Sequence, residues 1–147
     1  MRKRLSYFVL PLCLCFSLCG CQSGQNFTFL SFSQVKTLEV FTGAVPAAAV
    51  KKIVTVPDDI KTVLYMVNRI RIKGRAEEKD LTAGGIGIYF QFYLTSGSTV
   101  VLHVLGDGKL LQMDGVTYKI APVDLEKLWD SLPYDEIPVG EDELPTG

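Results

Sequence analysis

Four short segments between residues 86 and 120 constrain the fold more than any other part of the chain. The two faces of the first segment alternate, with every second residue a large apolar one, and the other three are short segments rich in apolar residues. Such segments are typical of antiparallel strands with one buried face. The segments are residues 86–95, 99–105, 109–113 and 116–120, and glycine-containing turns separate them. The last turn, Asp114-Gly115, is a strong signal for a two-residue type I′ hairpin. The sequence therefore predicts a four-stranded antiparallel meander.

The turns also predict which side chains of the meander are buried. With Asp114-Gly115 as the turn, Met113 opposes Val116 and Leu111 opposes Tyr118. The buried face then holds Leu111, Met113, Val116, Tyr118 and Ile120, and the first strand contributes Ile86, Ile88, Phe90, Phe92 and Leu94. The other face of the first strand carries aromatic and polar side chains, among them Tyr89, Gln91 and Tyr93.

The position of His103, the only histidine, depends on the turn before it. A two-residue Ser96-Gly97 loop would pair His103 with Phe90 and turn it to the core. A three-residue loop would place Gly97 in the left-handed position that such hairpins favour and pair His103 with Tyr89. We favour the second register, because it also turns the neighbouring apolar residues of the second strand to the buried face. It predicts a candidate interaction face of Tyr89, Gln91, Tyr93 and His103, unless other elements of the domain cover it.

The rest of the chain supplies two more strands and two helices. Residues 35–42 and 50–56 have strand character and are expected to pair with each other. A helix is predicted from Pro57, since proline suits the first helical turn. Its apolar stripe is Ile60, Val63, Leu64, Val67 and Ile70, and a closing helix over residues 122–132 carries Leu125, Leu128, Trp129 and Leu132. The fold class expected is α+β: an N-terminal strand pair, an amphipathic helix, the four-stranded meander and a C-terminal helix.

Two charged segments are harder to assign. In residues 69–80 four cations alternate with apolar residues and glycine before three acidic residues follow. One interpretation is a basic patch that faces anionic lipid or a cell-wall polymer. The interpretation we favour from sequence is a solvated loop whose charges largely neutralise each other. The acidic, proline-rich tail over residues 134–147 is expected to be disordered.

The N-terminus has the organisation of an export signal. Arg2, Lys3 and Arg4 precede a 14-residue apolar stretch, residues 5–18, which is short for a membrane-spanning helix. The run ends in Leu18-Cys19-Gly20-Cys21, which resembles the lipobox of bacterial lipoproteins. That resemblance implies cleavage before Cys21 and a diacylglyceryl group on its thiol. The expected organisation is a signal peptide over residues 1–20, a lipidated tether over 21–33, a single domain over 34–133 and the tail over 134–147.

Composition excludes several classes of function. All four cysteines lie in the signal region or at its cleavage site, so the domain lacks the thiols for a disulfide or a cysteine-metal site. Beyond residue 20 the chain holds 12 Lys/Arg and 16 Asp/Glu, a net charge of −4, which argues against general nucleic-acid binding. One histidine makes a catalytic zinc site improbable. No nucleophile motif or phosphate-cradling glycine loop is present, so we expect no cofactor and no enzymatic activity.

Residues 35–132 combine two strands, a helix, a Gly-containing hairpin and an Asp-Gly turn before an aromatic strand. As a whole they resemble small extracytoplasmic domains of unknown function in lipoproteins of Gram-positive bacteria. The resemblance implies an α+β domain and an extracytoplasmic location, and it implies no activity. The chain is expected to be a lipid-anchored module that binds an envelope protein or peptide. Its expected location is the outer face of the cytoplasmic membrane, or the outer membrane if the organism has two membranes. The alternatives are a small envelope hydrolase that uses surface carboxylates and an accessory solute-binding lipoprotein.

Overall fold

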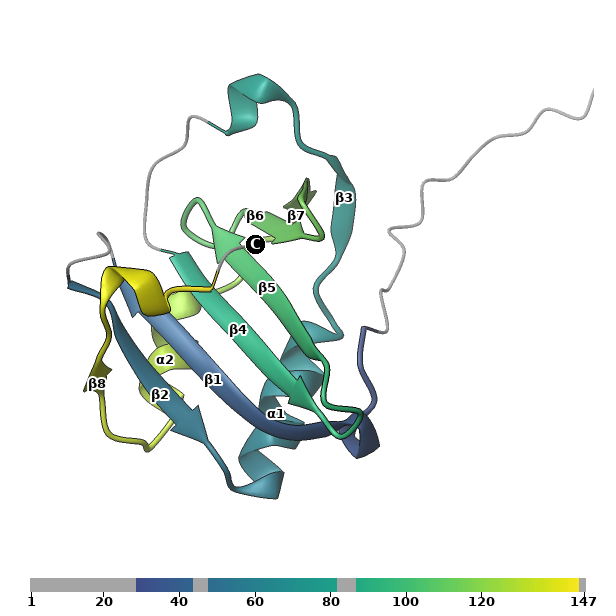
Figure 1. Ribbon diagram of the computed structural model, residues 1–147. Coiled ribbons are helices and arrows are strands. Elements are labelled where there is room, and N and C mark those ends of the chain that lie inside the picture. The colour runs from purple at the N-terminus through teal and green to yellow at the C-terminus, as the bar shows by residue number, and fades with distance from the viewer. Residues whose placement is uncertain (1–28, 44–47, 82–86, 146–147) are drawn as a thin grey trace, which may run out of the picture.

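An antiparallel sheet of eight strands is the frame of the computed structural model, which describes residues 29–43, 48–81 and 87–145. Its strands are β1 (Val35–Gly43), β2 (Val50–Val54), β3 (Ile72–Arg75), β4 (Gly87–Leu94), β5 (Thr99–Leu105), β6 (Leu110–Met113), β7 (Val116–Ile120) and β8 (Ile137–Pro138). Their order across the sheet is β3-β7-β6-β5-β4-β1-β2-β8 (Figure 1). The two helices are α1 (Pro57–Val67) and α2 (Leu125–Ser131). The predicted α+β class is therefore confirmed.

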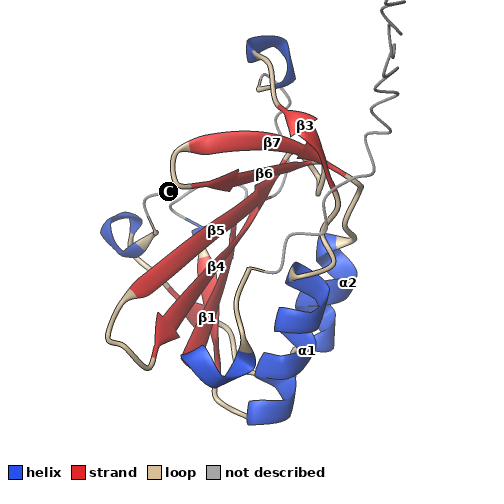
Figure 2. Ribbon diagram, turned by 90° about the vertical axis from the view of Figure 1, so that its right-hand side faces the viewer, coloured by secondary structure: helices blue, strands red, loops and turns tan. Residues whose placement is uncertain are grey.

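The main core lies between one face of the sheet and the two helices. Figure 2 shows α1 and α2 together on one side of the sheet, and the C-terminal segment with its short 3-10 turn η4 (Glu141–Glu143) on the other. The innermost side chains of this core, each at most 1% exposed, are Leu38, Val40, Val54, Val63, Ile88, Phe90, Phe92, Leu102 and Val104. Because the strands alternate, every second residue is left for the opposite face.

The meander has the register that its turns predict. Strands β4 to β7 pair in sequence, and Tyr89 pairs with His103 across β4 and β5. Gly97 has φ +89°, which fits the three-residue loop, whereas Asp114 and Gly115 have φ +50° and +72°, as a type I′ turn requires. Met113 accordingly pairs with Val116, and the predicted register is confirmed.

Helix α1 also follows the sequence pattern. It begins at Pro57 and its buried side chains are Ile60, Val63, Leu64 and Val67. The predicted stripe extended to Ile70, which is buried but lies beyond the end of the helix at Asn68. The Asn68 side chain binds the incoming N-terminal segment: its Oδ1 accepts from the Phe29 N–H at 2.7 Å, and its Nδ2 donates to the Leu30 carbonyl at 2.9 Å. The C-terminus of α1 thus holds the start of the domain.

Helix α2 is short and is held at both ends by side chains. Asp124 caps its N-terminus by accepting from the Lys127 N–H at 3.0 Å. At its other end the buried ammonium of Lys52, from β2, donates to the carbonyls of Trp129 and Leu132, both at 2.9 Å. The same ammonium lies 4.5 Å from the centre of the Trp129 ring. These carbonyls also accept from the N–H groups of Leu132 and Tyr134, so the ammonium is a second donor, placed where the helix dipole favours a cation.

The charged stretch over residues 69–80 differs from the solvated loop favoured from sequence. Its middle part forms β3, an edge strand that pairs with β7, and residues Glu78–Asp80 form the 3-10 turn η3. Ile72 is half-buried against the main core, while Lys73 and Arg75 are exposed. A register shift between Ile72 and Gly74 interrupts the pairing. The alternation of apolar and cationic residues therefore marked a half-buried strand.

Both ends of the domain lie outside the predicted bounds of 34 and 133. Leu30 belongs to the main core, and the Phe29 ring lies 6.5 Å from that of Phe92, so the last residues of the predicted tether pack on the domain. The tail predicted to be disordered adds β8 to the sheet beside β2, and Val139 is buried. Its scattered apolar residues supply enough contact to order an otherwise acidic segment. Within residues 29–43, 48–81 and 87–145, no helix has the length and apolar character needed to cross a membrane. The lipobox lies outside the described residues.

Candidate functional site

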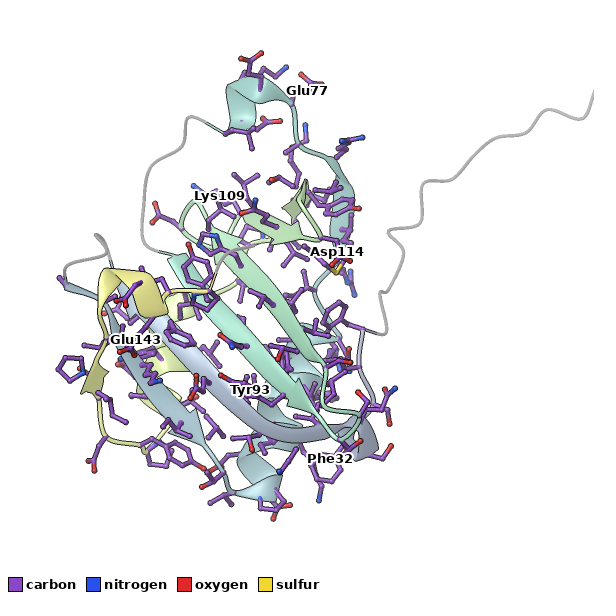
Figure 3. All side chains as sticks on the ribbon, in the orientation of Figure 1. Phe32, Glu77, Tyr93, Lys109, Asp114 and Glu143 are labelled. Carbon is purple, nitrogen blue, oxygen red and sulfur yellow. The ribbon has the colours of Figure 1, made fainter. Side chains whose placement is uncertain are left out.

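The sheet face opposite the helices carries the candidate interaction residues. Tyr89, Gln91 and Tyr93 occupy alternate positions of β4, and His103 lies next to Tyr89 on β5. Together with Glu39 of β1 and Gln112 of β6, they form what we call the polar sheet face. All six side chains are half-buried. The structure therefore brings the four predicted residues onto one surface, which faces the viewer in Figures 1 and 3, where Tyr93 is labelled.

Tyr89 and His103 form a stacked pair at one end of this face. Their ring centres are 3.7 Å apart and the ring planes differ by 11°. Gly87 permits this arrangement, because a Cβ there would lie 2.6 Å from the His103 Nε2. Burial lowers the pKa of His103, and a hydrogen bond with Gln112 offsets part of that effect. The imidazole is thus held neutral and in a fixed orientation.

A chain of polar contacts continues across the face. The Gln91 amide donates to the Tyr93 hydroxyl at 2.9 Å, and that hydroxyl donates to the Glu39 carboxylate at 3.0 Å. The Lys51 ammonium of β2 lies 3.4 Å from the Glu39 carboxylate and 3.9 Å from that of Glu143. Burial, and then the hydrogen bond to Glu39, raises the pKa of Tyr93. The phenol therefore stays protonated over the physiological range.

The C-terminal segment covers one end of the same face. Phe41, Ala49 and Val139 form a small buried cluster there, and the side chains of Tyr89 and Leu144 pack against it. The helices lie on the far side of the sheet, so they do not cover the polar sheet face (Figure 2). Coverage by another element of the domain is therefore found at the Tyr89 end of the face, where the C-terminal segment lies.

The chemistry of this face suits binding. It presents hydroxyl, amide and imidazole groups beside aromatic rings, and such amphipathic side chains are enriched at protein interfaces. Within the described parts of the chain, no cluster of three or more His, Cys, Asp or Glu side chains could hold a metal ion. The single histidine contacts Tyr89 and Gln112, and its pKa is lowered by burial.

Sequence reasoning missed the residues that β1 and β2 bring to the face. Glu39 contacts Tyr93 because β1 pairs with β4, and Lys51 reaches Glu39 because β2 pairs with β1. The alternation in residues 35–42 put Glu39 and Phe41 on one face, and that was the available signal. It did not show which strand would lie alongside.

Comparisons of this chain with protein-family models, with curated proteins and with solved structures found no match. The case for its function therefore depends on the geometry of its own residues.

Proposed function

We propose that this chain is a lipid-anchored module of the cell envelope that binds an extracytoplasmic protein or peptide through the polar sheet face. The diacylglyceryl group on Cys21 would hold it on the outer face of the cytoplasmic membrane, or on the outer membrane if the organism has two. The proposal has a single supporting observation at its centre. Aromatic and polar side chains from β1, β4 and β5 form a connected, half-exposed surface on the side of the sheet away from the helices.

Two physical features support a binding role for this surface. Its side chains are fixed before a partner arrives, because Tyr93 is hydrogen-bonded to Gln91 and Glu39 and His103 is stacked on Tyr89. Preorganised groups lose less conformational entropy on binding. In addition, tyrosine combines a large apolar ring with a hydroxyl at low entropy cost, which makes it frequent among residues that contribute most to binding. We therefore propose a non-enzymatic role in which the face recognises its partner by shape and hydrogen bonds.

Site-specific photo-crosslinking in intact cells tests the proposal. A photoreactive phenylalanine analogue replaces Gln91 in one strain and Tyr65 in another. Tyr65 is a matched control, because it is 64% exposed on α1, on the other side of the sheet. We expect a discrete adduct from position 91 and none of the same mass from position 65.

A second variant ties the adduct to the proposed residues. Tyr93→Ala with His103→Ala removes two side chains that are outside both hydrophobic clusters, so the fold should survive, which circular dichroism would check. The adduct from position 91 should then disappear. Persistence of that adduct in the folded double variant, or the same adduct from position 65, would contradict the proposal.

A further inference from the structure

A second surface, at the β3 edge of the sheet, collects positive charge. Its lining includes four lysines from four different segments: Lys73 of β3, Lys79 of η3, Lys109 of the turn before β6, and Lys119 of β7. Asp80 is the one acidic side chain in that lining. We call this surface the lysine groove. Figure 3 shows Lys109 at the upper end of the molecule, whereas Tyr93 of the polar sheet face lies toward the lower end.

The acidic residues nearby leave much of this charge without compensation. The Asp80 carboxylate lies 3.4 Å from the Lys119 ammonium, and it also accepts from the Glu77 N–H at 2.8 Å. The Lys79 ammonium pairs with the Glu77 carboxylate at 2.7 Å, and both side chains are largely exposed. Among the described residues, Lys73 and Lys109 form no ion pair and both are exposed. The four lysines of the groove therefore outnumber the two carboxylates that pair with them, those of Asp80 and Glu77.

The backbone fixes where these charges are presented. The turn before β6 has three consecutive residues in the left-handed region, Gly106, Asp107 and Gly108, with φ between +53° and +79°. A side chain at Gly108 would overlap the backbone carbonyl of Val123, whose N–H donates to the Gly108 carbonyl at 3.0 Å. The Ile120 N–H donates to the Lys109 carbonyl at 2.9 Å. The lysines are thus held in one groove by a constrained turn and by sheet pairing.

The start of β3, next to the groove, lies beside the first described residues of the N-terminal segment. Asn68, four residues before β3, binds Phe29 and Leu30, and the Phe29 side chain shares a small apolar cavity with Ile72 of β3. Phe29 lies eight positions after Cys21 in the sequence. Such a segment spans at most about 28 Å even when fully extended. A lipid on Cys21 would therefore hold the domain near the bilayer, with the groove within reach of its surface.

We propose that the lysine groove docks on the anionic phospholipid headgroups of the membrane that holds the lipid anchor. The inference depends on the proposed anchor at Cys21. Lysine ammonium groups are hydrated point charges on flexible stems, and they suit diffuse attraction to phosphodiesters better than recognition of one planar ligand. Each lysine near an anionic surface strengthens association about fivefold, equal to about 1 kcal/mol. Docking at this end leaves the polar sheet face free for its partner.

Lysine protection in lipid nanodiscs tests this docking. The full chain, matured in its host, is reconstituted into discs of phosphatidylcholine alone or of phosphatidylcholine with phosphatidylglycerol. A short pulse of an amine-acetylating reagent is followed by mass spectrometry of each lysine. We expect Lys73 and Lys109 to be modified about fivefold more slowly in the anionic discs, and the difference to vanish at high salt. Lys36 of β1 and Lys61 of α1, which are exposed and lie outside the groove lining, should react alike in both discs.

The matched variants are Lys73→Gln with Lys109→Gln, and Lys36→Gln with Lys61→Gln, which remove the same charge. The first pair should abolish the protection of Lys119 in anionic discs, and the second should leave it unchanged. Equal modification of the groove lysines in the two kinds of disc would overturn the docking proposal. Protection by added soluble polyphosphate in phosphatidylcholine discs, without protection by phosphatidylglycerol, would also overturn it and indicate a polymer ligand. Co-elution with phosphatidylcholine discs reports the anchor alone, so failure of the anchor is distinguished from failure of docking.

Discussion

Lys52 offers a sharp test of the packing between the sheet and α2. Its side chain crosses from β2 into the main core, where the residue is 6% exposed. Lys52→Met keeps most of the apolar stem but removes the ammonium. The backbone carbonyls of Trp129 and Leu132 then lose a charged donor and keep only the N–H groups of Leu132 and Tyr134. The ring of Trp129 also loses its cation.

The expected magnitude follows from opposing contributions. Hydrogen bonds from a charged donor contribute about 1.5–3 kcal/mol each, and the contact with the ring about 1 kcal/mol. Removing the ammonium also removes its desolvation cost, which is several kcal/mol for a buried ion. We expect a net loss of about 2 kcal/mol in the free energy of unfolding, because the two charged hydrogen bonds and the ring contact together exceed the desolvation cost that the variant avoids.

Urea unfolding followed by the fluorescence of Trp129, the only tryptophan, measures this loss next to the altered contact. A loss of about 2 kcal/mol lowers the midpoint by about 1 M urea for a domain of this size. Lys36→Met, at an exposed position of β1, is the control and should change stability by less than about 0.5 kcal/mol. An unchanged or higher midpoint for Lys52→Met would refute the reasoning, since burial of the charge would then cost as much as its contacts contribute.

Three further predictions concern single residues. His103 should titrate below the ordinary histidine pKa in an NMR experiment, because burial disfavours its charged form. The free energy of unfolding should therefore fall as the pH drops below about 6.5, since the unfolded chain then binds a proton more readily than the folded one. His103→Gln should lose that pH dependence. Gly87→Ala should destabilise the fold by about 1–3 kcal/mol in urea unfolding, because the new methyl group would meet the His103 ring. An unchanged unfolding midpoint would argue against the stacked geometry of Tyr89 and His103. Cys21→Ala should block lipid attachment, which mass spectrometry of the membrane fraction detects, and an acylated, normally cleaved product would show that another residue carries the lipid.

The sequence was most informative where structure depends on neighbouring residues. The Asp114-Gly115 turn and Gly97 set the meander register, and proline with its following stripe set the start of α1. These features are local, because each turn or cap is specified by a few adjacent side chains. The register in turn placed His103 beside Tyr89, so the core of the candidate face could be predicted.

What the sequence did not show depends on contacts between distant segments. The pairing of β1 with β4, which brings Glu39 to Tyr93, has no local signature. Strand β3 is four residues long, rich in cations and irregularly paired, so its pattern resembled a solvated loop. The C-terminal segment was judged by its acidic, proline-rich composition, yet Val139 is buried in a cluster with Phe41. Composition describes an average, and one well-placed apolar residue can decide whether a segment packs.

The two edges of the sheet have a consequence for crowding. A lipid anchor would confine many copies of the domain to two dimensions, at high local concentration and with similar orientation, where exposed strand edges are prone to join between molecules. At one edge β8 has only two residues, and Pro138 has no N–H to offer a neighbouring strand. At the other edge β3 is interrupted before Gly74 and carries Lys73 and Arg75, so two such edges would repel each other. We expect the anchored molecules to remain separate on a densely populated membrane, with their sheets unable to extend from one copy to the next.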